Sequence, residues 1–171
     1  NLLSNKNISI KYNQTYNFNY KLKPKILTIY TGPLDALMKF KFGKLEWRSL
    51  VFKKKIKQTK DFQGTSVMNF PDLKNKFTRI HEPKHLHPER SIFNKNSTLI
   101  IEEYSVKNDN EPYYPINNER NRSIHRKYKF EVGKIKKFDF GGRLADYAYY
   151  DMDMTISAAL KKFENIKKKI K

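Results

Sequence analysis

The chain of 171 residues has the length of one domain, or of a large part of a bigger one. Hydrophobic residues make up 38% of it and aromatic residues 14%, which is enough for a packed core and argues against disorder throughout. The absence of cysteine excludes disulfides, a thiolate nucleophile and a zinc–thiolate site. The apolar runs are too short for a membrane-spanning helix and no signal peptide opens the sequence, so we expect a cytoplasmic protein without a membrane partner.

The formal net charge is +19, from 36 Lys and Arg against 17 Asp and Glu. A charge of this size would ordinarily suggest nucleic acid or another polyanion as a ligand. However, 29 of the 36 basic residues are Lys, and they are scattered along a sequence that is also rich in Asn and Ile. We interpret the charge as a compositional bias carried on a solvated surface and expect no nucleic-acid partner. A basic nucleic-acid-binding module stays open as an alternative, and it requires basic residues gathered on one face.

Short apolar runs separated by turn residues fill the first two thirds of the chain and predict an antiparallel or mixed sheet. Strands are predicted at residues 25–30, 45–52, 62–70, 77–82 and 97–104, with an edge strand at Ile8, Ile10 and Tyr12. The run at 25–30 is predicted to be a buried strand that ends at Thr31-Gly32-Pro33, because proline cannot extend a ladder. Helical patterns at 34–42 and 119–130 complete an α/β pattern of the α+β type.

The last 34 residues or so predict a strand, a glycine turn and a long helix. Residues 138–140 end an apolar segment, and the pair Gly141-Gly142 allows backbone angles that other residues avoid. Asp151 and Asp153 stand where carboxylates cap the start of a helix. The helix that follows carries apolar residues at helical spacing: Ile156, Leu160, Phe163, Ile166 and Ile170.

This glycine turn is the best candidate anion site in the sequence. A glycine turn that leads into a helix start favours phosphate, because free N–H groups and the helix dipole both attract an anion. Arg143 lies directly beside the turn. The alternative is an ordinary strand-to-helix connection in which Asp151 and Asp153 act as caps rather than as an acid–base pair.

Arg48, Arg79 and Arg143 stand out because each lies in an apolar or aromatic context, unlike the lysines. Arginine offers phosphate a planar fork that stays charged, although three structural ion pairs would explain the same residues. Tyrosine clusters at 113–114 and 147–150 could donate hydroxyl hydrogen bonds to a diphosphate, or could pack their rings with the hydroxyl groups left in solvent. A second group, formed by His81, His85 and His87 with Glu82 and Glu89, invites a metal interpretation. We predict no metal, because Pro83 and Pro88 interrupt any helix that would align these side chains.

Six stretches together resemble the UDP-galactopyranose mutase family, in the same order and at similar spacing. The resemblance extends from about Leu27 to about Leu160, and its last motif is the most specific: residues 30–35, 45–50, 64–70, 77–80, 112–116 and 142–153. It implies a flavin-dependent isomerase that interconverts the pyranose and furanose forms of UDP-galactose for surface polysaccharide. Reduced FAD is then the cofactor, and its flavin N5 attacks the anomeric carbon and displaces UDP.

The resemblance also implies roles for individual residues. Arg79 corresponds to an arginine that binds the substrate diphosphate, Arg48 to a second arginine of the cleft, and Asn69 to a substrate-side asparagine. Tyr114 and Tyr149 correspond to tyrosines whose hydroxyls reach the diphosphate. The cofactor side is carried by the glycine turn and the helix start: Gly142, Arg143, Asp151, Met152, Asp153, Met154 and Thr155.

The same resemblance divides the chain into three parts. Residues 1–44 would supply a strand and turn of the Rossmann-like FAD-binding domain, 45–116 an antiparallel sheet that binds substrate, and 117–171 a helix and the closing strand-turn-helix of the FAD domain. The family's dinucleotide fingerprint and helical domain have no counterpart here, so we expect a C-terminal part of a mutase that alone neither retains FAD nor turns over substrate.

Three questions stay open at the level of sequence. The segment 81–90 departs from the family pattern beside Arg79, so UDP-N-acetylgalactosamine or another UDP-sugar is an alternative to UDP-galactose. A different FAD-dependent oxidoreductase of the amine-oxidase type would share the closing helix but not the paired arginines. A homodimer is compatible with the sequence.

Overall fold

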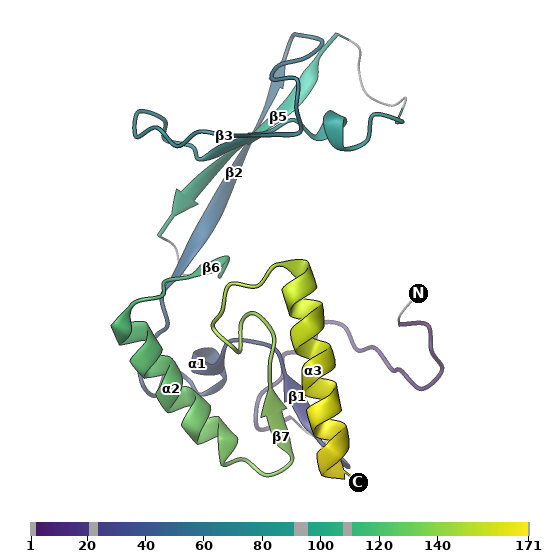
Figure 1. The fold of residues 1–171 in the computed structure, drawn as a ribbon, viewed down its shortest axis with the longest axis vertical. Coiled ribbons are helices and arrows are strands. Elements are labelled where there is room, and N and C mark those ends of the chain that lie inside the picture. The colour runs from purple at the N-terminus through teal and green to yellow at the C-terminus, as the bar shows by residue number, and fades with distance from the viewer. Residues whose placement is uncertain (1–2, 21–23, 91–95, 108–110, 171) are drawn as a thin grey trace.

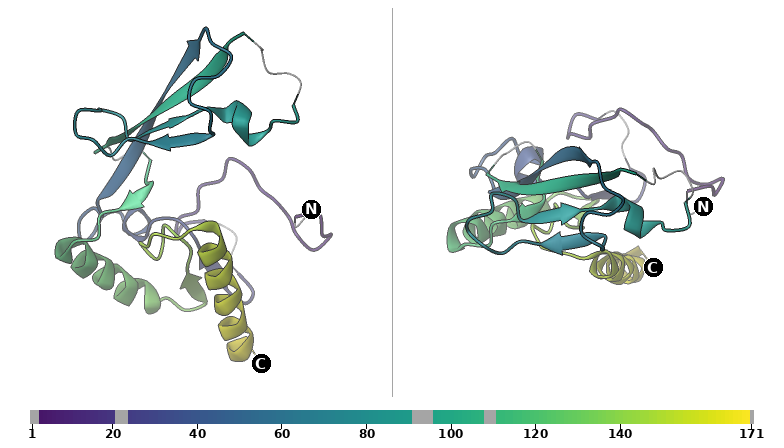
Figure 2. Two further views of the ribbon diagram at one scale, coloured as in Figure 1. Left: turned by 45° about the horizontal axis from the view of Figure 1, so that its top comes forward. Right: turned by 90° about the horizontal axis from the view of Figure 1, so that it is seen from above.

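The computed structural model describes residues 3–20, 24–90, 96–107 and 111–170. A body of helices and a small parallel sheet lies at one end of the molecule, and a twisted antiparallel sheet extends away from it (Figure 1). The elements of the body are β1 (Thr28–Tyr30), α1 (Leu34–Leu37), α2 (Glu119–Gly133), β7 (Phe138–Phe140) and α3 (Met152–Ile170). β1 and β7 pair in parallel, and α2 and α3 flank this pair in both Figure 1 and the left view of Figure 2.

The antiparallel sheet has the strand order β3-β4-β5-β2-β6. Its strands are β2 (Trp47–Lys57), β3 (Val67–Asn69), β4 (Arg79–His81), β5 (Thr98–Val106) and β6 (Tyr114–Pro115), and a short 3₁₀-helix, η1 (Pro83–Leu86), follows β4. The ladder between β2 and β5 runs from the pair Ser49–Val106 to the pair Lys57–Thr98. The first residues of β2 lie in the body, so this strand connects the two parts of the molecule (Figure 1).

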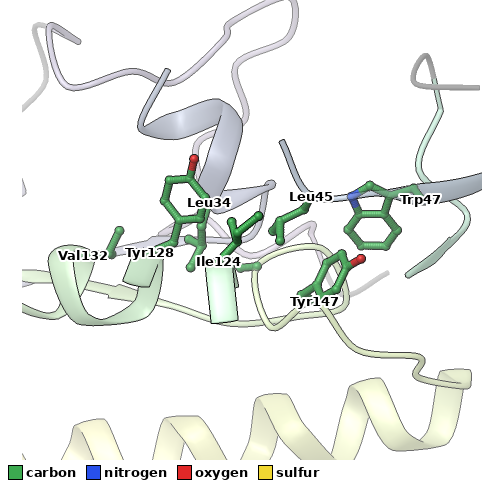
Figure 3. Close-up of a cluster of buried hydrophobic side chains, with 8 residues drawn as sticks. Leu34, Leu45, Trp47, Ile124, Tyr128, Val132 and Tyr147 are labelled. Atoms are coloured by element: carbon green, nitrogen blue, oxygen red, sulfur yellow. The ribbon is translucent and has the colours of Figure 1, made fainter. Parts of the chain in front are cut away.

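The core of the body forms where α2 packs against the start of β2 and the loop after β7 (Figure 3). Its buried members are Leu34, Leu45, Trp47, Ile124, Tyr128, Val132, Ala145 and Tyr147. α2 supplies a stripe at four-residue spacing, and its start is capped by the Asn118 side chain, which accepts a hydrogen bond from the Asn121 amide at 2.8 Å. The Tyr128 hydroxyl donates to the Gly43 carbonyl at 2.8 Å and accepts from the Phe42 amide at 2.9 Å.

The predicted edge strand at Ile8, Ile10 and Tyr12 is wrong. These residues form no strand, and their side chains are exposed. An alternating pattern becomes a strand only where a sheet edge accepts it, and in the described residues the sheet partners come from other segments. The N-terminal segment is instead attached through aromatic rings, with Tyr16 and Phe18 about 6 Å from Phe138 (6.2 and 5.9 Å between ring centroids).

Several other predicted elements have different lengths. The strand predicted to be buried at 25–30 is shortened to β1 and is not buried, since Ile29 is 52% exposed. α1 ends at Leu37, because Lys39 and Phe40 adopt left-handed backbone angles. The strand predicted at 62–70 is shortened to β3, because residues 62–64 form a loop that is held by the Glu82 carboxylate. β2 continues past Phe52 through the lysine-rich run to Lys57, which pairs with the buried strand β5.

α3 begins at Met152, and the Asp151 carbonyl accepts the first helical hydrogen bond, from the Thr155 amide at 2.9 Å. Its apolar stripe does not face the body: Ile156, Leu160 and Phe163 are 61%, 63% and 59% exposed. The helix contacts β7 through Lys162, whose Nζ lies 2.8 Å from the Asp139 carboxylate. The predicted helix is therefore confirmed, while its apolar face is open in this chain.

The expected α+β class is confirmed, with a curled antiparallel sheet, a parallel pair and helices. Seen from above, the strands of the antiparallel sheet lie over the body (Figure 2, right). Among the described residues no helix combines the length and the apolar character needed to cross a bilayer.

Candidate functional site

A groove of about 380 Å³ lies between the antiparallel sheet and the segment that follows β7. Five strands and two loops, β3–β4 and β7–α3, contribute to its wall, because the sheet curls over the segment that precedes α3. The lining residues are Leu50, Asn69, Phe70, Pro71, Thr78, Arg79, Glu103, Ser105, Tyr114 and Tyr149. Four of the five residues expected on the substrate side therefore line one groove.

Strand register explains why these side chains share a face. Asn69 on β3 lies opposite Arg79 on β4, and Arg79 lies opposite Glu103 on β5. Residues directly opposite each other in antiparallel strands project to the same side of the sheet. The next pair along, Leu50 with Ser105, also lines the groove. Asn69, Arg79 and Glu103 thus form a polar row across three neighbouring strands.

Arg79 is held in this row by two acceptors. Its Nε donates to the Asn69 carboxamide oxygen at 2.9 Å, and its Nη1 lies 3.7 Å from Glu103 Oε1. Glu103 is only 5% exposed, and its other oxygen contacts His81 Nε2 at 3.0 Å. The Arg79 side chain remains 44% exposed, so its guanidinium is oriented but accessible to a ligand in the groove.

Tyr114 and Tyr149 stack at the body end of the groove. Their ring centroids are 5.6 Å apart with an interplanar angle of 27°. The Arg143 guanidinium carbon lies 5.4 Å from the centroid of each ring, and Nη2 donates to the Tyr113 carbonyl. Its Nε is buried and has no hydrogen-bond partner among the described residues. A charged group with an unused buried donor is costly unless an anion or another acceptor completes it.

Arg48 differs from the other predicted substrate residues. It is exposed and lies opposite Tyr114 in the β2–β6 pair, on the same face of β2 as Leu50. It is not part of the groove wall. The structure therefore brings Asn69, Arg79, Tyr114 and Tyr149 together and places Arg48 beside them, at the edge of the site.

Two of the predicted cofactor residues, Gly142 and Thr155, line a second, mainly apolar cavity of about 460 Å³ between β1 and α3. Gly141, Gly142 and Thr155 contribute to its wall, and Gly142 adopts a φ of 87°, which favours glycine. The Gly142 amide already donates to the Asp146 carboxylate at 3.1 Å. An anion at this turn would therefore contact the start of α3 rather than the glycine amide.

The helix start itself is accessible. Asp151, Met152, Asp153 and Met154 are exposed, and the first amides of any α-helix lack partners within the helix. Arg143 stands apart from this helix start, in contact with the tyrosine pair that belongs to the groove. The structure therefore links Arg143 to the groove wall, a contact that the sequence did not predict.

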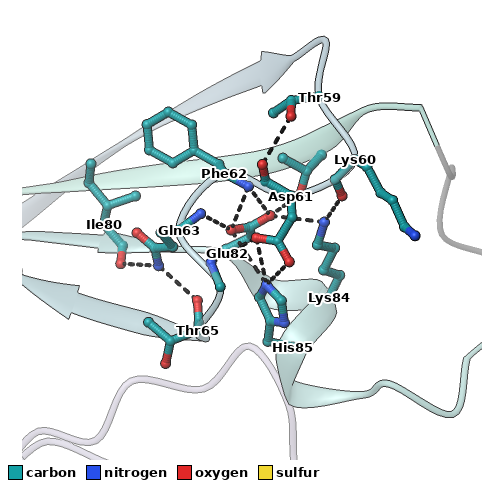
Figure 4. Close-up of polar contacts among 12 residues, drawn as sticks. Thr59, Lys60, Asp61, Phe62, Gln63, Thr65, Ile80, Glu82, Lys84 and His85 are labelled. Atoms are coloured by element: carbon teal, nitrogen blue, oxygen red, sulfur yellow. Dashed lines mark hydrogen bonds and ion pairs between the residues drawn. The ribbon is translucent and has the colours of Figure 1, made fainter.

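The histidines of segment 81–90 contact different carboxylates, and Figure 4 shows the one of them, His85, that lies beside Glu82 and Asp61. His81 contacts Glu103, His87 contacts Glu89, and only His85 comes close to Glu82 and Asp61. Glu82 accepts hydrogen bonds from the Gln63 amide at 2.9 Å and the Thr98 hydroxyl at 2.7 Å, and Lys84 Nζ lies 3.1 Å away. The Glu82 carboxylate therefore has hydrogen-bond donors and a cation around it, and its structural role is to hold the loop at 62–64 in place.

Electrostatics agree with this structural role. Burial alone would raise the pKa of Glu82, but the Thr98 hydroxyl, the Gln63 amide and Lys84 together lower it. In the body, burial raises the pKa of Tyr147 to about 12. Its hydroxyl donates to the backbone carbonyls of Glu46 and Ile116, so Tyr147 is a neutral donor within the core of the body.

Sequence reasoning missed Glu103. It sits in the run Leu99-Ile100-Ile101-Glu102-Glu103 of β5, where two adjacent carboxylates must point to opposite faces. Both are buried, Glu102 against Lys55 and Tyr104, and Glu103 in the groove. Two adjacent carboxylates within an apolar strand could have indicated Glu103 as a site residue, because a buried charge needs a partner.

The sequence profile described as "UDP-galactopyranose mutase" matches residues 1–149. The chain belongs to the UDP-galactopyranose mutase family. It is 36% identical over 166 residues to the UDP-galactopyranose mutase of Mycoplasma genitalium, an alignment that covers 94% of this chain and 40% of that protein. The expected family is therefore confirmed.

Two further relatives support the same family. A probable UDP-galactopyranose mutase of Klebsiella pneumoniae is 39% identical over 134 residues, covering 77% of this chain and 34% of the relative. A dTDP-fucopyranose mutase of Escherichia coli is 33% identical over 133 residues, with the same coverage of each chain. The chain thus spans only 34–40% of the length of these mutases.

Proposed function

We propose that the groove binds the diphosphate of UDP-galactose in an enzyme that interconverts its pyranose and furanose forms. The single observation that carries the proposal is the convergence of Arg79, Asn69, Tyr114 and Tyr149 on one groove. Arginine and tyrosine hydroxyls offer the donors that a diphosphate requires. The stacked rings supply a flat apolar wall that excludes water on one side of the ligand.

The residues of this chain bind and orient rather than transfer protons. Arg79 neutralises the diphosphate, which stays attached in the substrate and leaves with the nucleotide when the anomeric bond breaks. Asn69 fixes the guanidinium from the side, and the tyrosine hydroxyls donate to the phosphate oxygens. Arg48 at the rim adds a positive charge that attracts the dianion as it enters.

A flavin fits beside the groove. The unpaired Arg143 Nε, the accessible start of α3 and the adjacent apolar cavity suit an anionic cofactor with a flat ring system. Arg143 and residues 151–155 would hold it. When bound in reduced form, FAD would supply the nucleophile that displaces UDP. Since the chain spans 34–40% of its relatives, we propose that activity also requires their remaining sequence, and that the isolated chain retains no flavin.

The proposed substrate is a nucleoside diphosphate sugar. The relatives are named for UDP-galactopyranose and dTDP-fucopyranose, which share a pyranose linked to a nucleoside diphosphate. We favour UDP-galactose because mutases of that name include a relative whose alignment covers 94% of this chain. The residues that we assign recognise the diphosphate, so a related UDP-sugar would occupy the same groove.

The test is conversion of UDP-galactofuranose to UDP-galactopyranose by the full-length gene product with reduced FAD, followed by chromatography. Arg79→Ala should lose most of the activity. Arg126→Ala is the matched control, because Arg126 is an exposed arginine on α2 that pairs with Glu119. Turnover of an amine without any effect of Arg79→Ala would instead indicate an oxidoreductase of the amine-oxidase type.

A further inference from the structure

Glu103 is shared between two basic side chains of the same strand. Arg79 and His81 are two residues apart on β4, so both project to the groove side of the sheet. Glu103 Oε1 lies 3.7 Å from Arg79 Nη1, and Glu103 Oε2 lies 3.0 Å from His81 Nε2. The Thr78 hydroxyl adds a weaker contact to Oε1 at 3.4 Å. The shorter of the two basic contacts is the one to the histidine.

We propose that His81 is a positioning residue of the diphosphate site, which sets through Glu103 how strongly Arg79 is available to the ligand. The inference rests on the proposed function. Glu103 is a buried carboxylate in the groove wall, so its charge competes with a diphosphate for the Arg79 guanidinium. A protonated His81 offsets the negative charge of Glu103. When His81 is neutral, Glu103 interacts with Arg79 alone.

Among the described residues of the neighbouring strands, few other charges lie on this face of the sheet. On the same face, β3 contributes Val67 and Asn69, which do not titrate, and β2 contributes Phe52 and Lys54. Lys54 lies opposite Ile101, two strands from His81, and stays charged across the physiological range. Histidine side chains in general change charge between about pH 5 and 8, and His81 is the histidine in contact with Glu103.

The sign follows from the charges. Protonation of His81 adds a cation beside the groove and weakens the hold of Glu103 on Arg79, and both effects favour a bound dianion. Affinity for a UDP-sugar should therefore be higher at low pH and fall as pH rises through the neutral range. His81 does not line the groove, so its state should change substrate affinity and KM rather than kcat.

The experiment is an NMR titration of the full-length gene product with UDP-galactose at about pH 5.5, 6.5 and 7.5, which brackets histidine protonation. UDP-galactose is used instead of UDP because a terminal phosphate itself titrates near pH 6. We expect affinity to weaken about five- to tenfold over this range, less than the loss of a direct charged hydrogen bond, because His81 acts on Arg79 through Glu103. His81→Gln should remove the dependence and bind weakly throughout. His81→Lys should bind tightly throughout.

His87→Gln is the matched control, because His87 contacts Glu89 in the same segment away from the groove, and it should keep the full pH dependence. Two results overturn the proposal. If His81→Gln binds UDP-galactose with an unchanged pH dependence, His81 plays no part while the diphosphate site stands. If neither the wild type nor any variant binds UDP-galactose, the diphosphate site itself is wrong, and this proposal fails with it.

Discussion

Tyr114 and Tyr149 stack across the junction of the two parts of the molecule, with ring centroids 5.6 Å apart. Tyr114 belongs to β6 of the antiparallel sheet, whereas Tyr149 lies in the loop between β7 and α3. Arg143 contacts both rings. The groove is therefore assembled from segments that are distant in sequence, and its geometry depends on how the sheet is attached to the body.

Replacement of Arg79 by Ala should weaken UDP-galactose binding by one to two orders of magnitude, because a charged hydrogen bond contributes about 1.5–3 kcal/mol. Arg79→Lys should recover only part of this loss, since a point charge cannot make the two parallel bonds of a guanidinium. Calorimetric or NMR titration measures both affinities. Equal affinity of wild type and Arg79→Ala would remove Arg79 from the site.

Two substitutions at Tyr149 separate its hydroxyl from its ring. Tyr149→Phe keeps the stack with Tyr114 but removes the proposed phosphate donor, so affinity should fall about tenfold or more, because a hydrogen bond to a charged group contributes about 1.5–3 kcal/mol. Tyr149→Ala also removes the ring and should cost more. Tyr12→Phe, at an exposed position that is distant from Tyr149 in the sequence, serves as the control in the same titration. Wild-type affinity in Tyr149→Phe would leave the hydroxyl without a role.

Tyr128→Phe should lower the free energy of unfolding by about 1–3 kcal/mol, because it leaves a buried donor and a buried acceptor unsatisfied. Tyr128 is 0% exposed, and its hydroxyl bridges the Phe42 amide and the Gly43 carbonyl. Urea denaturation measures the change. Tyr12→Phe should unfold at the wild-type urea concentration. A Tyr128→Phe protein as stable as wild type would contradict the bridging role.

The Glu82 carboxylate should make stability depend on pH. Its pKa is lower in the folded chain than in the unfolded chain, so its contribution is complete above the unfolded value of about 4.3 and is lost as pH falls below it. Glu82→Gln should destabilise the chain at pH 7, because its amide group would face donors, and should flatten the decline in acid. Urea unfolding at several pH values tests this. Glu89→Gln, an exposed substitution, should keep the wild-type profile.

Local patterns predicted the strong elements well. The apolar stripe of α2, the alternation in β2 and the proline stops after β1 and β4 predicted elements that the structure confirms. These signals are local, because each depends on side-chain periodicity or on a backbone constraint. Patterns that need a partner failed: Ile8, Ile10 and Tyr12 alternate without a sheet edge to join, and the apolar stripe of α3 has nothing packed on it among the described residues.

Family motifs predicted which residues belong to the site, but the sequence did not predict the contacts among them. Nothing in the sequence indicates that Asn69, Arg79 and Glu103 fall into one row, because that depends on the register of three strands. The contact of Arg143 with the tyrosine pair likewise depends on how the loop before α3 meets β6. Spacing along the chain does not carry this information, since register is set by the packing of the whole sheet.

The most direct test of the central claim is a crystal structure of the protein with UDP-galactose. We predict that the diphosphate lies in the groove, with oxygens at about 2.7–3.2 Å from the Arg79 guanidinium and the Tyr149 hydroxyl. A diphosphate bound instead along the lysine-rich half of β2, with the groove between Tyr114 and Arg79 unoccupied, would contradict the account.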